Sequence, residues 1–151
     1  MLQQNLHIAV LKDNIEKISN ALISFKKSLE KCESIGIKEM YTFEELEAFD
    51  SLTVKFARIS DILTQKVLRT IFILLREDNL TFIDICKKAE KHQLIDDADS
   101  LLSIRDIRNQ VSHDYNDENL KTLYADIFKL SPQLESAIQN VIAFSKRYNW
   151  I

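Results

Sequence analysis

Apolar residues recur every three or four positions along three long stretches of the chain. The first stretch runs from about Asn5 to Ile35 and forms one seam: Ile8, Leu11, Ile15, Ile18, Leu22, Phe25, Leu29 and Cys32. Alternating steps of three and four are typical of helices that pack nearly parallel or antiparallel to one another. The pattern therefore predicts a helix over 5–35, and Gly36 suits its C-terminal cap.

A second long helix is expected to start near Thr42. Thr42 and Glu45 have the spacing of a capping box. The seam that follows has the same steps: Phe49, Leu52, Phe56, Ile59, Leu63, Val67, Ile71 and Leu74. Between Val67 and Leu75 apolar residues lie on most sides, so we expect that half to be buried all round except at Arg69. The polar residues 76–79 should end the helix.

Two shorter helices and a third long one complete the chain. Thr81 to His92 fits a short helix, as does Asp96 to about Ser112, whose acidic start suits a helix N-terminus. The last helix begins near Asp117 and has its own seam: Leu120, Leu123, Ile127, Leu130, Leu134, Ala137, Val141, Phe144 and Tyr148. Pro132 lies inside it, and proline removes a helical hydrogen bond, so we expect a kink or a break there.

Composition agrees with an all-helical fold. The 151 residues include one Gly and one Pro, against averages of about 7% and about 5%. Hairpins and glycine-rich phosphate loops are therefore unfavourable. The sequence predicts an all-α, up-down bundle of about five helices that forms a single domain over residues 1–151. The same seams are also suited to a dimer interface, and the pattern does not separate the two uses.

Charge and cysteine usage narrow the class of protein. Lys and Arg number 20 and Asp and Glu number 23, so the net charge of −3 does not favour bulk nucleic-acid binding, although a local basic site stays open. The longest apolar run, Ile71 to Leu75, is too short to span a bilayer, and residues 1–20 lack a signal-peptide core. Cys32 and Cys86 lack metal-ligand spacing and are expected to be buried or idle thiols. We expect a cytoplasmic protein.

Polar side chains with matching chemistry gather at the end of the fourth helix: Arg105, Arg108, Asn109, Ser112, His113 and Tyr115. Arginine offers a planar, permanently charged fork that fits phosphate oxygens, and histidine exchanges a proton near neutral pH. RNA carries its own nucleophile, the 2′-hydroxyl, so a ribonuclease needs only proton transfer and stabilisation of the phosphorane. No carboxylate cluster indicates a two-metal site, and no cofactor motif is present.

The spacing of the two central residues presents a geometric problem. Arg108 and His113 lie five positions apart, which places them about 140° apart around an ideal helix. They converge if the helix ends near Ser112 or if the long arginine side chain curls around it. Two chains that pool their residues would also solve the problem, because a dimer supplies one histidine as base and another as acid.

The stretch Arg108-Asn109-x-x-x-His113-x-Tyr115 resembles the R-x4-H-x-Y signature of HEPN-domain proteins, specifically the HepT-type toxins. The segment 42–75 resembles the second helix of such proteins, so the likeness covers roughly residues 5–150. It implies a homodimeric, metal-independent RNA endonuclease with a composite site, the toxin of a toxin–antitoxin pair. Arg108 and His113 would be the catalytic pair, with Asn109 as a polar helper.

The resemblance also implies a partner. The antitoxins of the family are small MNT-type nucleotidyltransferases, and in several systems they transfer AMP to the motif tyrosine, here Tyr115. An attached nucleotide would block RNA by charge and bulk. The alternative function is that of a non-catalytic subunit that binds a small nucleotidyltransferase or its nucleotide, with Arg108 and Arg105 gripping phosphate.

Structural roles compete with these functional ones. Arg105 is expected to be solvated or paired with Asp106 or Asp99, and residues 113–116 are expected to form a turn. Residues of the second helix are candidates either for the same cleft or for a buried ion pair between helices: Arg58, Asp61 and Arg69. Two histidines are expected at the surface and one tryptophan as a packing anchor: His7, His92 and Trp150.

Overall fold

The computed structural model of the protein describes residues 1–77, 79–111 and 117–151. These residues form helices and connecting loops without a strand, so the predicted all-α class is confirmed. The elements are α1 (Leu2–Ile35), α2 (Phe43–Asp61), the π-helix η1 (Ile62–Leu68), α3 (Arg69–Leu74), α4 (Phe82–Lys91), α5 (Ala98–Val111) and α6 (Asp117–Arg147). None of these helices is both long enough and apolar enough to cross a membrane.

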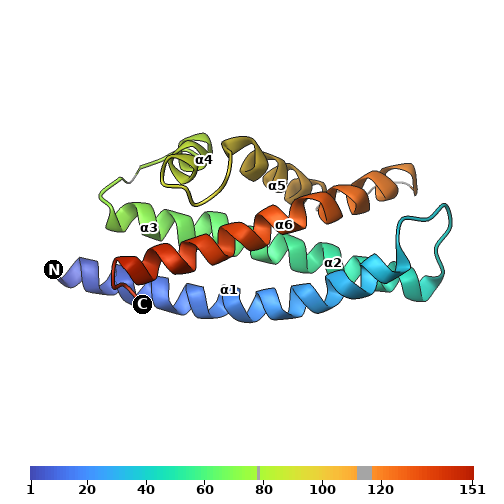
Figure 1. Cartoon of the computed structure of the whole chain (residues 1–151), viewed down its shortest axis with the longest axis horizontal. Helices are drawn as coiled ribbons and strands as arrows, with labels where there is room; N and C mark the ends of the chain where they lie inside the picture. The colour runs from blue at the N-terminus through green and yellow to red at the C-terminus, as the bar shows by residue number, and fades with distance from the viewer. Residues whose placement is uncertain (78, 112–116) are drawn as a thin grey trace.

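The elements assemble into an elongated bundle (Figure 1). The α2–η1–α3 segment is one continuous rod that packs along α1, and α6 packs against both. The short helices α4 and α5 lie together on the other side of the rod, with α5 against α2. This arrangement sets the last turns of α5 beside the end of α2, where the candidate site lies.

The predicted helix ends are confirmed where capping chemistry was visible in the sequence. Thr42 accepts a hydrogen bond from the Glu45 backbone while Glu45 reaches back to the Thr42 backbone, and Thr81 and Asp84 form the same reciprocal cap for α4. Gly36 ends α1 with a φ of 79°, a left-handed conformation that favours glycine. Local sequence thus determines where three of the helices begin or end.

The three apolar seams meet in one hydrophobic core. Most of their members are less than 9% exposed, including Phe25 of α1, Phe56 of α2 and Ile127 of α6. Trp150 is 6% exposed and stacks on Tyr148, so its predicted role as a packing anchor is confirmed. Burial of a single Leu, Ile or Phe side chain contributes about 1.5–3 kcal/mol, so these seams supply the main stabilisation of the bundle.

Two features of the long helices differ from simple expectation. The second helix contains a seven-residue π-helical segment, η1, which the seam did not predict. At its entry the Ser60 and Thr64 hydroxyls each donate to the carbonyl four residues earlier, both at 2.8 Å, and such bonds compete with the regular helical ladder. π-Helical segments are rare and are frequently found at functional sites.

The last helix passes through Pro132 as a single element, so the break considered from the sequence does not occur. Core residues on both sides of the proline, Ile127 and Leu134, are fully buried in the same core. Next to the proline, the Ser131 hydroxyl donates to the Ile127 carbonyl. Packing therefore offsets the hydrogen bond that the proline removes.

Candidate functional site

The best-defined polar contact of the structure joins α5 to α2. Arg108 Nε donates to Asp61 Oδ1 at 2.8 Å, and Arg108 Nη2 donates to Asp61 Oδ2 at 3.0 Å. This two-pronged geometry fixes the plane of the guanidinium. The hydrogen bond and the charge of Asp61 raise the pKa of Arg108 above its ordinary value. Asp61 therefore forms an ion pair between helices, one of the two roles considered for it, although the pair is only partly buried.

This ion pair is open to solvent. The side chains are 33% exposed for Arg108 and 43% exposed for Asp61. Ion pairs at such exposure contribute at most about 1 kcal/mol to stability because water screens them. The pair is therefore better placed to orient reactive groups than to hold the bundle together.

Arg108 and Asp61 line a small pocket of about 130 Å³. Four of its lining residues come from the end of α2 and from η1, and four come from α5: Ser60, Asp61, Thr64, Gln65, Ile104, Arg105, Arg108 and Asn109. Four candidates from the sequence thus lie together: Arg108, Asn109, Arg105 and Asp61. Ser60, Thr64 and Gln65 were not among the candidates from the sequence, although they form a polar group directly beside the apolar seam and were a visible signal.

Arg105 has a different contact from those expected. Its guanidinium lies over the Phe82 ring of α4, 4.2 Å from the ring centroid, in a cation–π arrangement. Arg105 is exposed, as expected for a solvated side chain, but its contact among the described residues is with an aromatic ring and not with Asp106 or Asp99. Nearby, burial raises the pKa of the Cys86 thiol to about 11 against the opposing charge of Arg105. The expected burial of Cys86, and of Cys32, is confirmed.

Two further arginines of the second helix lie outside the lining of this pocket. Arg58 is exposed on α2. Arg69 lies at the start of α3, where it donates hydrogen bonds to the Leu80 carbonyl and to Gln65. Neither arginine is among the described lining residues of the Arg108 pocket, and a place at the cleft of the full motif stays a prediction. η1 separates Asp61 from Arg69 along the rod and explains why they serve different surfaces.

Three candidates from the sequence, Ser112, His113 and Tyr115, lie outside the described residues. The expected turn over 113–116 also lies there. α5 is described as far as Val111, three residues after Arg108. The convergence of Arg108 and His113 therefore stays a prediction.

Within the described ranges, no group of three or more His, Cys, Asp or Glu side chains has the arrangement that would hold a metal ion. The described chemistry of the pocket consists of guanidinium, carboxylate, amide and hydroxyl groups. Such groups recognise a polar or anionic ligand through hydrogen bonds. No protein-family model, curated protein or solved structure matches the chain. The fold and this pocket define it as an all-α bundle with an arginine–carboxylate site.

Proposed function

We propose that the protein is a metal-independent RNA endonuclease of the HEPN type, acting as the toxin of a toxin–antitoxin pair. The observation that carries this proposal is the position of Arg108. It lies in the last turn of α5, is oriented by Asp61, and lines a pocket together with Asn109. These are the motif residues that the sequence resemblance assigns to catalysis.

The chemistry follows from the two ionisable types in the motif. His113 takes the proton from the RNA 2′-hydroxyl, which attacks the adjacent phosphorus, and the 5′-oxygen of the next nucleotide leaves with a proton. Arg108 stabilises the negative charge that accumulates on the phosphorane oxygens. A homodimer supplies a second His113, so that one histidine acts as base and the other as acid.

Asp61 serves as a positioning residue in this scheme. Its carboxylate holds the guanidinium plane through two hydrogen bonds at 2.8 and 3.0 Å. Prior orientation matters because a misplacement of about 1 Å at a catalytic group costs about 100-fold in rate. The partial exposure of both side chains leaves the pair within reach of a substrate at the surface.

The decisive experiment is RNA cleavage by the purified protein in the presence of a metal chelator. We expect the wild type to cleave RNA, and His113→Ala and Arg108→Ala to lose at least about 100-fold in rate. Arg58→Ala is the matched control, because Arg58 is an exposed arginine of α2 outside the pocket. Cleavage that survives His113→Ala, or that needs an added metal, would contradict the proposal.

The same ion pair also supports a second function. Both members of the pair are partly exposed, at 33% and 43%, and Arg105 beside them is exposed. Accessible charges of both signs suit a non-catalytic subunit that binds a small nucleotidyltransferase or its nucleotide. A protein that co-purifies with a nucleotidyltransferase and does not cleave RNA would establish this second function and exclude the first.

The proposed partner also has a direct test. AMP transfer from an MNT-type nucleotidyltransferase to Tyr115 would add a negative charge and a nucleotide beside His113. Intact-mass measurement after co-expression should show the added nucleotide on the wild type and not on Tyr115→Phe. An unmodified wild type that is nevertheless inactivated by its partner would show that inhibition uses binding alone.

A further inference from the structure

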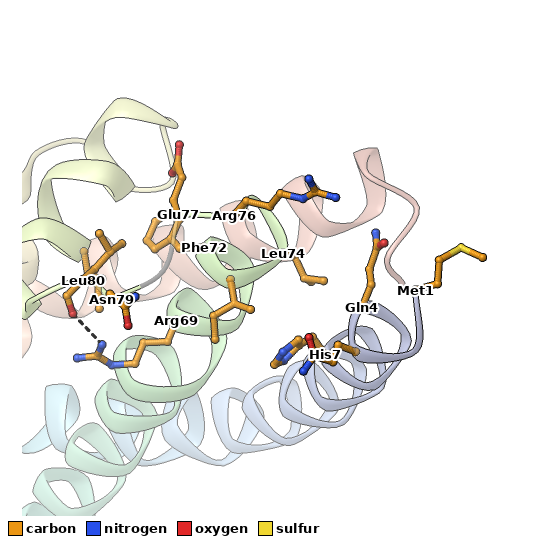
Figure 2. Close-up of a pocket in the computed structure, with 13 residues that line it drawn as sticks. Met1, Gln4, His7, Arg69, Phe72, Leu74, Arg76, Glu77, Asn79 and Leu80 are labelled. Carbon is orange, nitrogen blue, oxygen red and sulfur yellow. Dashed lines mark hydrogen bonds between the residues drawn. The ribbon is translucent and has the colours of Figure 1, made fainter.

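A second and larger cavity, of about 740 Å³, lies away from the Arg108 pocket and shares no lining residue with it. Figure 2 shows its two sides: the first turns of α1, which carry Gln4 and His7, and the end of α3 with the loop that follows it. Its volume falls in the range of about 300–1,000 Å³ that is typical of small-molecule sites. The charges around it indicate what kind of molecule it would hold.

Arg69 is the central cation of this cavity. Its Nη1 donates to the Leu80 carbonyl at 3.1 Å, and its Nε donates to the Gln65 side-chain oxygen at 3.2 Å (Figure 2 draws the first of these). Both acceptors are neutral. The two bonds therefore fix the direction of the guanidinium without cancelling its charge, which is the condition for an effective anion ligand.

Arg76 and His7 also line the cavity and carry nitrogen donors. Arg76 follows α3 in a left-handed backbone conformation with a φ of 60°. Among the described residues its side chain forms no hydrogen bond or ion pair, and in Figure 2 it extends toward the side of the cavity that carries Gln4. The cavity thus combines one oriented arginine with one adaptable arginine.

Glu77 is the one carboxylate among the described lining residues, and other groups already compensate it. His92 Nε2 lies 3.2 Å and Lys88 Nζ lies 3.6 Å from its Oε2. Burial disfavours the ionised form, but the His92 hydrogen bond and the Lys88 charge outweigh it and lower the pKa of Glu77. In Figure 2 its carboxylate points away from Arg69. Counted over the described lining residues, the charge beside Arg69 is therefore positive.

The wall of the cavity also contains apolar side chains. Ile73 is 36% exposed, and Leu74 and Leu80 are half-buried. The expectation that residues 67–75 are buried all round is therefore wrong at Ile73, because this side of α3 opens onto the cavity. A purely ionic ligand would leave this apolar surface in water. A ligand with an apolar part would cover it and gain about 25 cal/mol per Å² of buried surface.

We propose that this cavity binds a small organic phosphate, with the phosphate at Arg69, the apolar part against Ile73 and Leu80, and Arg76 adding positive charge from the opposite side of the cavity. The phosphate accepts the guanidinium N–H groups that face the cavity, and His7 lies within the same lining. The proposal does not depend on RNA cleavage, because none of these residues lines the Arg108 pocket.

Calorimetric titration with phenyl phosphate, in a buffer of about 50 mM ionic strength that limits screening, tests the proposal. We expect saturable binding. Arg76→Gln should weaken it about 5-fold and Arg69→Gln about 20-fold, because each substitution removes one positively charged guanidinium. Arg58→Gln is the control, because it removes the same charge from an exposed position outside both pockets. Inorganic phosphate should bind about 10-fold more weakly than phenyl phosphate, because it lacks the apolar part.

Several results would overturn the proposal. One is a wild type that does not bind phenyl phosphate up to about 10 mM, which corresponds to negligible affinity. Another is an Arg58→Gln variant that binds as weakly as Arg76→Gln, since general charge would then explain the attraction. Equal affinities for phenyl phosphate and inorganic phosphate would show that the apolar part of the ligand contributes nothing to binding. Arg76→Gln keeps the test valid if Arg69→Gln fails to fold, because the Arg76 side chain supports no described contact.

Discussion

Arg108 and Arg69 are held by partners of different charge, one partner before the π-helix η1 and the other site after it. Arg108 meets the carboxylate of Asp61, just before η1, and its charge is compensated there. Arg69, just after η1, is held by a neutral carbonyl and a neutral amide and keeps its charge. Both guanidiniums are fixed in direction, but only Arg69 combines a fixed direction with an uncompensated charge.

The difference shows what each site is suited to do. A guanidinium held by a carboxylate sits in a defined place and attracts a ground-state anion weakly, which suits a group that acts on charge developing during a reaction. A guanidinium held by neutral dipoles attracts an anion that is already present, which suits binding. A fixed direction of the guanidinium therefore does not distinguish a catalytic arginine from a binding arginine. The charge of the group that holds the guanidinium distinguishes them.

The largest expected effect comes from removing the carboxylate at Arg108. Asp61→Ala removes both hydrogen bonds that fix the guanidinium, so RNA cleavage should fall about 100-fold, the cost of a catalytic group displaced by about 1 Å. Phenyl phosphate binding at Arg69 should stay unchanged, because Asp61 does not line that cavity. Initial cleavage rates and calorimetric titration of the same preparation give both values. Thermal unfolding is the control, since a partly exposed pair contributes at most about 1 kcal/mol.

Cleavage that is unaffected by Asp61→Ala would show that Arg108 does not need this partner. The conservative variant Asp61→Glu distinguishes positioning from mere presence of charge. It keeps the carboxylate and shifts it by one methylene, so a positioning role predicts a rate between those of the wild type and Asp61→Ala.

The next largest effect is expected from giving Arg69 a carboxylate partner, as Arg108 has. Gln65→Glu changes the neutral partner of Arg69 into a carboxylate of nearly the same shape, 3.2 Å from Arg69 Nε in the wild type. Affinity for phenyl phosphate should fall about 10-fold, since the new carboxylate competes with the phosphate for the guanidinium. Gln65→Met, which removes the hydrogen bond without adding charge, is the matched control and should weaken binding less. Equal losses in the two variants would mean that orientation, not charge, governs the site.

The sequence predicted the fold far better than it predicted the sites. Seams of apolar residues and capping boxes such as Thr42 with Glu45 are local patterns, and they specify the helices and the buried face of each. The partner of Arg108 lies 47 residues away, and the Leu80 carbonyl that holds Arg69 lies 11 residues away. Tertiary packing chooses among many carboxylates and carbonyls at such separations, whereas Gln65 lies only four residues from Arg69. A pattern of residue types indicates which side chains can take part in a site. It does not indicate which carboxylate neutralises the charge of which arginine.

His92 illustrates the same limit on a smaller scale. Its sequence position indicated a surface residue, yet the ring lies between Phe72 and Phe144, with both centroid distances at 5.9 Å, and bonds to Glu77. The surface expectation is therefore wrong, because α4 ends where α3 and α6 provide a pocket for the ring. No short-range pattern around residue 92 contains that information.

The smallest expected effect concerns Glu77, which separates the Arg69 cavity from the His92 contact. Because the pKa of Glu77 is lowered in the folded protein, its contribution is present above the ordinary glutamate pKa of about 4.3 and is lost as the pH falls through the lower folded value. The side chain is 25% exposed, so screening limits the contribution to less than about 1 kcal/mol. Glu77→Gln should therefore lower the unfolding temperature by a few degrees at about pH 6, and this deficit should shrink as the pH falls below about 4. Asp13→Asn, which alters an ion pair with both side chains at least 57% exposed, is the control and should show little difference at either pH. A Glu77→Gln deficit that persists at the lower pH would assign the effect to packing instead of charge, and the compensation of Glu77 that leaves the Arg69 cavity positive would have to be abandoned.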